Sequence, residues 1–273
     1  MSNQHSATPA AMLGSIIRHR ELLLDLVKRD FIGRYKGSML GVVWSLFNPL
    51  LMLAIYTLVF SVAFKAKWGA GEESKIAFAI VLFSGVIVQS FFAECLNRAP
   101  NLIISHPHYV KKVVFPLEIL PWMALFSALM HFLVSFSVLL LFCLLAGVDV
   151  HLGVLLTPLI LAPLILMTMG MSWAFASLGV YLRDLSQVIG MLTTISMFLA
   201  PIFYPIEALP EAYRALLAWN PITLPVMQLR DLMLWGKPFH WDQWGISLVI
   251  GLLFCQIGYW WFQKSRRGFA DVL

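Results

Sequence analysis

The stretch RYKGSMLGVVWSLFNPLLMLAIYTLVF, from Arg34 to Phe60, decides the fold of this chain. A basic cluster leads here directly into an apolar run, and no charged residue occurs between Lys36 and Lys65. The 28 uncharged residues from Gly37 to Phe64 would extend about 40 Å as a helix, which is enough to cross a bilayer with some tilt. The stretch therefore predicts a membrane-spanning helix with a basic group at one mouth.

The composition assigns the whole chain to the integral membrane proteins. Hydrophobic residues make up 60% and charged residues 12%, and the mean hydropathy is +0.83, which leaves too little polar surface for a soluble domain. The net charge of +5 comes from basic residues beside apolar runs, so it favours a membrane surface over nucleic acid. Cys95, Cys143 and Cys255 lie far apart in apolar segments, and we interpret them as core residues.

Two different segments precede the first apolar run. Met1 to Met12 is small and polar, and we expect a disordered cytoplasmic tail. From Leu13 to Ile32, apolar residues fall on one side of a helix and charged residues on the other. This pattern predicts a helix lying in the headgroup plane. A soluble helix packed on a partner protein is the alternative.

The chain then predicts an all-α membrane domain over residues 37–264. Uncharged runs give six spans, at about 39–64, 76–96, 118–147, 152–182, 186–204 and 244–263. Pro201 and Pro205 should break the fifth helix before PIFYP is complete. His131, inside the third span, is interpreted as a core residue hydrogen-bonded to a neighbouring helix rather than as part of a proton relay.

The segment 207–236, between the fifth and sixth spans, is half apolar and rich in proline. It predicts two amphipathic helices, Pro210–Trp219 and Leu224–Trp235, dipping into the membrane from the outer side, with a surface loop as the alternative. With the N-terminus inside, 13 basic residues face 6 on the outer side, which are Lys65, Lys67, Lys75, Arg214, Arg230 and Lys237. Both termini, including the tail 265–273, are therefore expected in the cytoplasm.

Motifs for catalysis are absent from the sequence. No G-x-x-x-x-G-K-[ST], H-E-x-x-H or G-x-S-x-G motif occurs, so the chain does not bind ATP through a phosphate loop. The span interiors lack the carboxylates that proton- or sodium-driven carriers use. His106 and His108 flank a proline without nearby cysteine or clustered acids, which disfavours a metal site. We expect no catalytic residue, cofactor or metal in this chain.

Four segments carry a family resemblance. In order, they are RDFIGRYKGSMLGVVWSLFNPLLMLAIYTLVFSVAF (29–64), YLRDLSQVIG (181–190), PIFYPIEALP (201–210) and WNPIT (219–223). Together they resemble the permease subunit of polysaccharide-export ABC transporters, the type-2 exporters of lipid-linked O-antigen, capsule or teichoic acid. The resemblance implies a homodimer of six-span subunits in the bacterial inner membrane. It also implies two copies of a separate ATPase subunit, which carries the ATP and magnesium.

The resemblance further implies where the partners bind. The ATPase would dock on a short helix in the first cytoplasmic loop, Asn97–Pro107, with contacts from Arg98, Asn101, His106 and Pro107. A smaller contact would fall at Arg183 and Asp184, for which a solvated turn is the alternative. The outer helix pair resembles the gate of this family.

A sugar path is the third expectation. Sugar rings stack on aromatic side chains, and in the resembling family the first and fifth spans line the channel. The candidates are Trp44, Phe47, Tyr56, Phe198, Phe203 and Tyr204, although aromatic residues in spans also face lipid or fill cores. At the cytoplasmic mouth, the cluster of Arg34, Tyr35 and Lys36 would hold the pyrophosphate of a polyprenyl-linked glycan. An ordinary basic flank is the alternative for this cluster.

Three other functions stay open at this point. A type-2 exporter of a small drug or lipid would share the whole sequence pattern. A transferase acting on polyprenyl lipids would need a constellation of carboxylates or histidines that the sequence does not offer. A passive channel would function without an ATPase partner.

Overall fold

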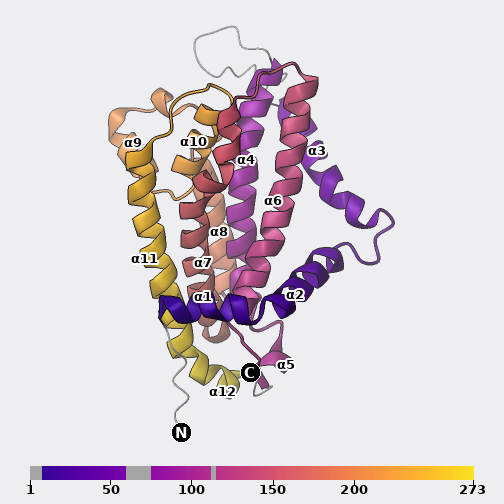
Figure 1. Ribbon diagram of the computed structural model, residues 1–273, viewed down its shortest axis with the longest axis vertical. Coiled ribbons are helices and arrows are strands. Elements are labelled where there is room, and N and C mark those ends of the chain that lie inside the picture. The colour runs from indigo at the N-terminus through magenta and orange to yellow at the C-terminus, as the bar shows by residue number, and fades with distance from the viewer. Residues whose placement is uncertain (1–7, 60–74, 112–114) are drawn as a thin grey trace.

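The computed structural model describes residues 8–59, 75–111 and 115–273, and these segments form helices and connecting turns without a strand (Figure 1). Among the described residues, four helices are long and apolar enough to cross a membrane. They are α4 (Lys75–Arg98), α6 (Ile119–Leu145), α7 (Thr157–Tyr181) and α11 (Trp241–Ser265). Two further apolar helices, α3 (Trp44–Tyr56) and α8 (Leu185–Leu199), are shorter. Four of the six predicted spans thus correspond to long helices.

The first predicted span begins later than residue 39. Gly37 and Gly41 have φ angles of 90° and 51°, a left-handed backbone that suits glycine and breaks a helix. A 3-10 turn, η1 (Gly41–Val43), follows, and α3 starts at Trp44. Residues 60–64 of the predicted span lie outside the described residues.

The fifth predicted span ends earlier than residue 204. Helix α8 stops at Leu199, because Ala200 adopts an extended backbone and Pro201 follows it. The predicted break before the end of PIFYP is therefore confirmed. The 15 residues of α8 extend about 22 Å, less than the roughly 30 Å of a hydrocarbon core.

The predicted amphipathic helix is present in two pieces, α1 (Pro9–Arg18) and α2 (Arg20–Gly33), which lie across one end of the bundle (Figure 1). Helix α1 begins within the predicted tail because Thr8 caps it, accepting a hydrogen bond from the Ala11 N–H. The break at His19 lets each piece pack on a different helix. Met12 of α1 contacts Cys255 of α11, whereas α2 packs against α6.

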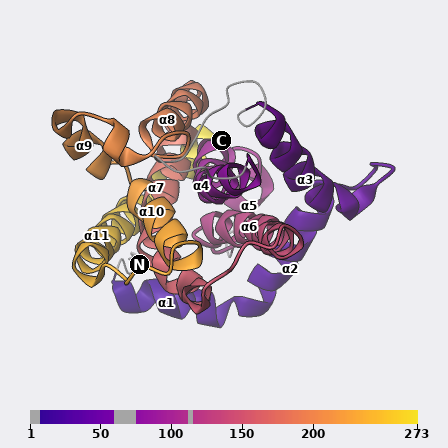
Figure 2. The ribbon, with the colours of Figure 1, turned by 90° about the horizontal axis from the view of Figure 1, so that it is seen from above.

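Helix α4 is the centre of the bundle. Its most apolar window is 78% buried, compared with 28% for α6 and α11 and 39% for α7. Seen along the bundle, α3 and α8 lie on either side of α4 (Figure 2), and both pack against it.

Helices α7 and α11 approach until their backbones touch. A Cβ atom added to Gly258 would lie 2.0 Å from the carbonyl oxygen of Gly170, and one added to Gly170 would lie 2.1 Å from that of Phe254. Membrane helices pack closely through such small residues.

The outer helix pair predicted over 207–236 is present as α9 (Glu211–Ala218) and α10 (Thr223–Met233), after the 3-10 turn η5 (Ile206–Ala208). Both lie at the distal end, which we define as the end opposite α1 and α2 (Figure 1). Nine of the 11 residues of α10 are buried, so α10 belongs to the core. Helix α9 is peripheral (Figure 2). Trp219, which follows it, is 86% exposed. Their insertion into the membrane stays a prediction.

The remaining short elements lie mostly at the end that carries α1 and α2. They are η3 (Ala99–Asn101), α5 (Pro107–Lys111), η4 (Leu152–Leu156), η6 (Arg266–Gly268) and α12 (Phe269–Val272). The predicted docking helix 97–107 is instead the end of α4, a 3-10 turn and the start of α5. The segment 265–273, predicted as a tail, folds back: Phe269 is fully buried, and Arg266 pairs with Glu118 at 2.7 Å.

Candidate functional site

A cluster of charged side chains joins the end of α2 to α4 and α6. Its members are Asp30, Arg34, Glu94, Arg98 and His131, which we call the junction cluster. Arg34 Nη1 lies 2.5 Å from Glu94 Oε1, and Arg98 Nη2 lies 2.6 Å from Asp30 Oδ1. The contacts within each helix are longer, at 3.4 Å for Asp30 with Arg34 and 3.9 Å for Glu94 with Arg98. Each arginine thus holds the acid of the other helix, and the cluster clamps α2 onto α4.

His131 completes the cluster from α6. Its Nδ1 lies 3.0 Å from Glu94 Oε2, and its Nε2 lies 3.0 Å from the Tyr35 hydroxyl. Arg34 Nη1 lies 3.1 Å from the same Nδ1. In the tautomer with its proton on Nδ1, the carboxylate accepts that N–H and the Tyr35 hydroxyl donates to Nε2. The ring also packs on Phe31, with centroids 4.8 Å apart. The predicted hydrogen bond between His131 and a neighbouring helix is confirmed, and the ring is half-buried instead of lying in the core.

The surroundings of Asp30 favour its charged form. Burial by itself would raise the pKa of this carboxyl, but hydrogen bonds from Arg98 and Ser127 and the charges of Arg98 and Arg34 lower the pKa below its usual value. A carboxyl whose pKa is lower in the folded state stabilises the fold above its ordinary pKa. That contribution is lost as the pH falls through the lowered value.

The predicted phosphate-binding residues have unequal surroundings. Arg34 is held by Glu94 and Asp30, and Tyr35 by His131. Lys36 is exposed, and its ammonium group has no ion-pair partner among the residues that the structure describes. The phosphate-binding role stays a prediction, and Lys36 is the cation whose charge is available for it.

The aromatic candidates fall into two groups. On α3, the rings of Trp44 and Phe47 meet edge to face with centroids 5.2 Å apart, and Trp44 Nε1 donates to Ser38 Oγ at 2.7 Å. Tyr56 is half-buried near the end of α3.

The second aromatic group lies at the distal end of α8. Phe198 is 60% exposed and lies 5.7 Å from the ring of Phe203. The Tyr204 hydroxyl donates to the Phe198 carbonyl oxygen at 2.9 Å, which fixes the turn after the helix.

Helices α3 and α8 also expose continuous apolar faces. On α8 the large exposed apolar side chains are Val188, Met191, Leu192, Ile195, Phe198 and Leu199; on α3 they are Leu46, Phe47, Leu50, Leu51, Met52 and Ile55. The spacing on α8 follows the helical repeat, so these side chains form one stripe. A stripe of this kind is covered by lipid or by a second protein chain.

The predicted ATPase contacts are not equally accessible. Arg98 belongs to the junction cluster, whereas Asn101 is exposed at the end of η3. His106 Nδ1 lies 2.8 Å from the Leu102 carbonyl oxygen, and its ring stacks on Tyr109 at 5.4 Å, just before Pro107 opens α5.

The second predicted contact lies close to the first. Arg183 and Asp184 are exposed in the turn between α7 and α8. A Cβ added to Gly179, near the end of α7, would lie 2.0 Å from the carbonyl oxygen of Pro100 in η3. The two predicted docking segments therefore share the end of the bundle that carries α1 and α2.

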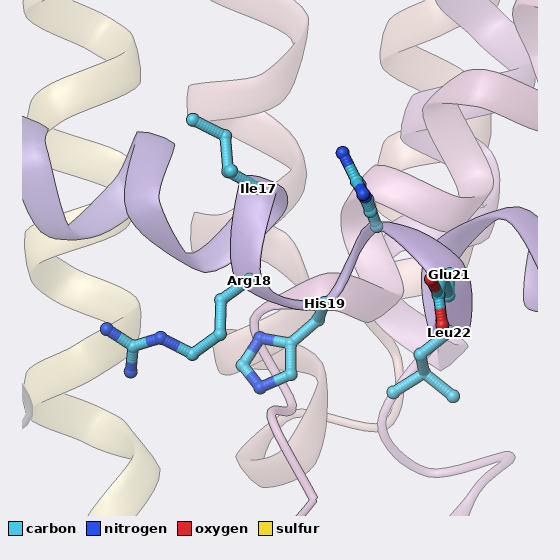
Figure 3. Close-up of a pocket in the computed structure, with 6 residues that line it drawn as sticks. Ile17, Arg18, His19, Glu21 and Leu22 are labelled. Carbon is cyan, nitrogen blue, oxygen red and sulfur yellow. The ribbon is translucent and has the colours of Figure 1, made fainter.

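A shallow hollow of about 620 Å³ opens at the break between α1 and α2. It is lined by Ile17, Arg18, His19, Arg20, Glu21 and Leu22. Ile17 points away from Arg18 and His19, and Glu21 lies on the other helix (Figure 3). The side chains diverge instead of converging on one point, so the hollow is not a built binding site.

The sequence interpretation missed two features, the junction cluster and the burial of Arg230. A sequence signal for the junction cluster exists, since Asp30 precedes Arg34 and Glu94 precedes Arg98 by four residues. Arg230 was counted among the outer-side cations, yet it is 1% exposed. An arginine in an amphipathic pattern is normally a surface residue, so local sequence gave no signal for its burial.

Comparison with known proteins agrees with the helical membrane architecture. The ABC-2 type transporter family matches residues 21–234 of this chain. Over 254 residues, the chain is 27% identical to the O-antigen export system permease protein RfbA of Klebsiella pneumoniae, covering 93% of this chain and 95% of that protein.

Two further relatives match over a shorter range. The RfbA permease of Myxococcus xanthus is 26% identical over 213 residues, covering 77% of this chain and 79% of that protein. The polysialic acid transport protein KpsM of Escherichia coli is 24% identical over 213 residues, covering 77% of this chain and 80% of that protein.

Proposed function

We propose, because this chain belongs to the ABC-2 type transporter family, that it is the membrane permease of an ATP-driven exporter of lipid-linked polysaccharide. The observation that carries the proposal is the similarity to an O-antigen permease along 93% of the chain. A small drug or lipid exporter would share the family but not this set of relatives, which are named for O-antigen or polysialic acid.

ATP hydrolysis takes place on a separate subunit, since the sequence carries no phosphate loop. Two ATPase copies dock at the end that carries α1 and α2. Asn101, Arg183 and Asp184 are exposed there, and η3 contacts the end of α7. The bundle gives this end a firm support, because η3 packs directly on α7. A push on η3 is therefore passed to α4 and α7.

The polysaccharide path lies between two copies of this chain. Helices α3 and α8 lie on either side of α4 (Figure 2). Their exposed apolar side chains include aromatic residues, which offer stacking surfaces without fixed charge. Sugar rings of different identity stack on such surfaces, which suits a polymer that slides. Lys36, at the start of the α3 segment, meets the phosphate groups of the lipid carrier.

The end that carries α1 and α2 lies on the cytoplasmic side of a bacterial inner membrane. This orientation follows the excess of basic residues in the segments of that side, 13 against 6. It also places the ATPase contacts in the compartment that holds ATP.

Deletion of the gene tests this function. We expect lipid-linked glycan to accumulate inside the cell and to disappear from the surface, because synthesis continues while export stops. The measurement compares intracellular and surface glycan in the deletion strain, with the intact gene restored as the control. Normal surface glycan combined with new drug sensitivity would favour the small-molecule exporter instead.

A further inference from the structure

Arg230 is a buried cation in α10 whose guanidinium reaches two other elements. It is 1% exposed. Its Nε donates to the carbonyl oxygen of Val81 in α4 at 2.9 Å, and Nη2 donates to that of Ile202 at 3.1 Å. Nη1 donates to the carbonyl oxygen of Pro201, so the two residues after the end of α8 are both held.

The bonded carbonyl groups explain why an arginine is needed here. Pro201 and Ile202 follow the last turn of α8, where the helical ladder no longer supplies donors. Away from water, such backbone groups need a donor from a side chain. Arginine presents five N–H groups in a rigid fork, so one side chain serves several acceptors.

The room for this guanidinium is kept by a glycine. A Cβ added to Gly85 of α4 would lie 2.6 Å from Arg230 Nη2 and 3.3 Å from side-chain atoms of Ile202 and Val226. Every other side chain at this position would push on the fork and on the residues it holds. Gly85 and Arg230 therefore form one fitted contact.

A second tie joins the outer pair to α8. Asn220, in the turn between α9 and α10, donates from Nδ2 to the Ser196 carbonyl oxygen at 2.8 Å. In return, Ser196 Oγ donates to Asn220 Oδ1 at 3.0 Å. One tie grips the last turn of α8 and the other grips the break that follows it.

We propose that Arg230 is a positioning residue for transport, which joins α10, the break after α8 and α4 into one unit. When the path opens at the α8 stripe, the outer pair moves together with the distal end of α8 instead of swinging away from it. Phe198, Phe203 and Tyr204 lie on either side of the same break, so Arg230 also sets the place of these aromatic side chains. The inference rests on the proposed function for the path.

Hydrogen exchange of the full chain with its co-expressed ATPase tests the unit directly. In Arg230→Met, we expect amide exchange to rise by about tenfold or more across 200–204 and 223–233, since the buried carbonyl groups lose their donors. Arg230→Lys should restore part of the protection. Gly85→Ala should act in the same direction while keeping the arginine, and Gly190→Ala, whose Cβ meets nothing within 4 Å, is the matched control.

Unchanged exchange in both Arg230→Met and Gly85→Ala would overturn the proposal, whatever the substrate is. If Arg230→Met does not assemble, Gly85→Ala and Arg230→Lys still decide it. Export should fall in the order wild type, Arg230→Lys, Arg230→Met at an equal amount of complex in the membrane. An equal loss of export and of assembly would instead show a purely structural role and contradict the proposal.

A cross-link tests the joint movement. Ser196→Cys and Asn220→Cys, joined through two mixed disulfides by a short bis-methanethiosulfonate reagent, replace the hydrogen bonds with a covalent tie that a reducing thiol cleaves. We expect export to continue in the cross-linked complex, because the two residues do not separate. Export that stops on cross-linking and returns on reduction would overturn the proposal. A wild-type complex without glycan export would instead count against the proposed function, and the exchange measurement would still stand.

Discussion

Replacing Gly258 with alanine will lower the melting temperature of the protein by about 5–10 °C, the range expected for overpacking a close helix contact in a chain of this size. The new Cβ atom would lie 2.0 Å from the carbonyl oxygen of Gly170. Because the obstacle is backbone, no side-chain rotation relieves it, and α7 and α11 must separate. Their contact is the most extensive between any two helices described, so the separation reaches the whole bundle.

The same helix supplies the control for this variant. Gly245 also lies in α11, and a Cβ added there meets nothing within 4 Å. Gly245→Ala should therefore keep the melting temperature or raise it slightly, since alanine favours helix by about 1 kcal/mol over glycine. Thermal unfolding in detergent, followed by tryptophan fluorescence or by aggregation, distinguishes the two. Equal melting temperatures would contradict the tight α7–α11 contact.

Alanine at Arg34 will lower the stability of the protein, whereas alanine at Lys36 will lower export. Arg34→Ala leaves the Glu94 carboxylate without its 2.5 Å partner and should cost about 1–3 kcal/mol, because the pair is only partly shielded from solvent. Lys36→Ala should leave stability unchanged, since the described structure shows no partner for its ammonium group. It should reduce export about five- to tenfold if that group holds phosphate oxygens.

Lys28→Ala is the control for Lys36, since Lys28 is also an exposed cation near the same end of the chain. The measurements are the melting temperature and the surface glycan at an equal amount of protein. Export in Lys36→Ala that equals export in Lys28→Ala would remove the phosphate role from Lys36. An unchanged melting temperature in Arg34→Ala would contradict the clamp between α2 and α4.

The sequence predicts a helix wherever an uncharged run or a proline sets its limits. The uncharged runs predict the four long helices, and Pro201 predicts the end of α8. The start of α3 was misplaced because hydropathy does not register the backbone turn at Gly37 and Gly41. The break at His19 was also missed, since the amphipathic pattern runs through it while α1 packs on α11 and α2 on α6.

The candidate site was predicted less fully, because its side chains depend on contacts between distant segments. Arg34 was expected to bind phosphate and Arg98 to contact the ATPase. In this structure Arg34 pairs with Glu94 of α4, and Arg98 pairs with Asp30 of α2. Arg230 was counted as an outer-side cation, although three backbone carbonyl groups surround it inside the bundle. The aromatic side chain of Phe198 was predicted as a candidate because it lies in the uncharged run that forms α8, where it is exposed.

Transport by the purified complex tests the central claim most directly. This chain and its ATPase are reconstituted into vesicles that contain lipid-linked glycan, and the glycan is measured by its susceptibility to an added glycosidase on each side. We predict that the glycan crosses the membrane only when ATP and both subunits are present. Glycan that crosses with this chain alone, or a complete complex that hydrolyses ATP without moving any glycan, would contradict the account.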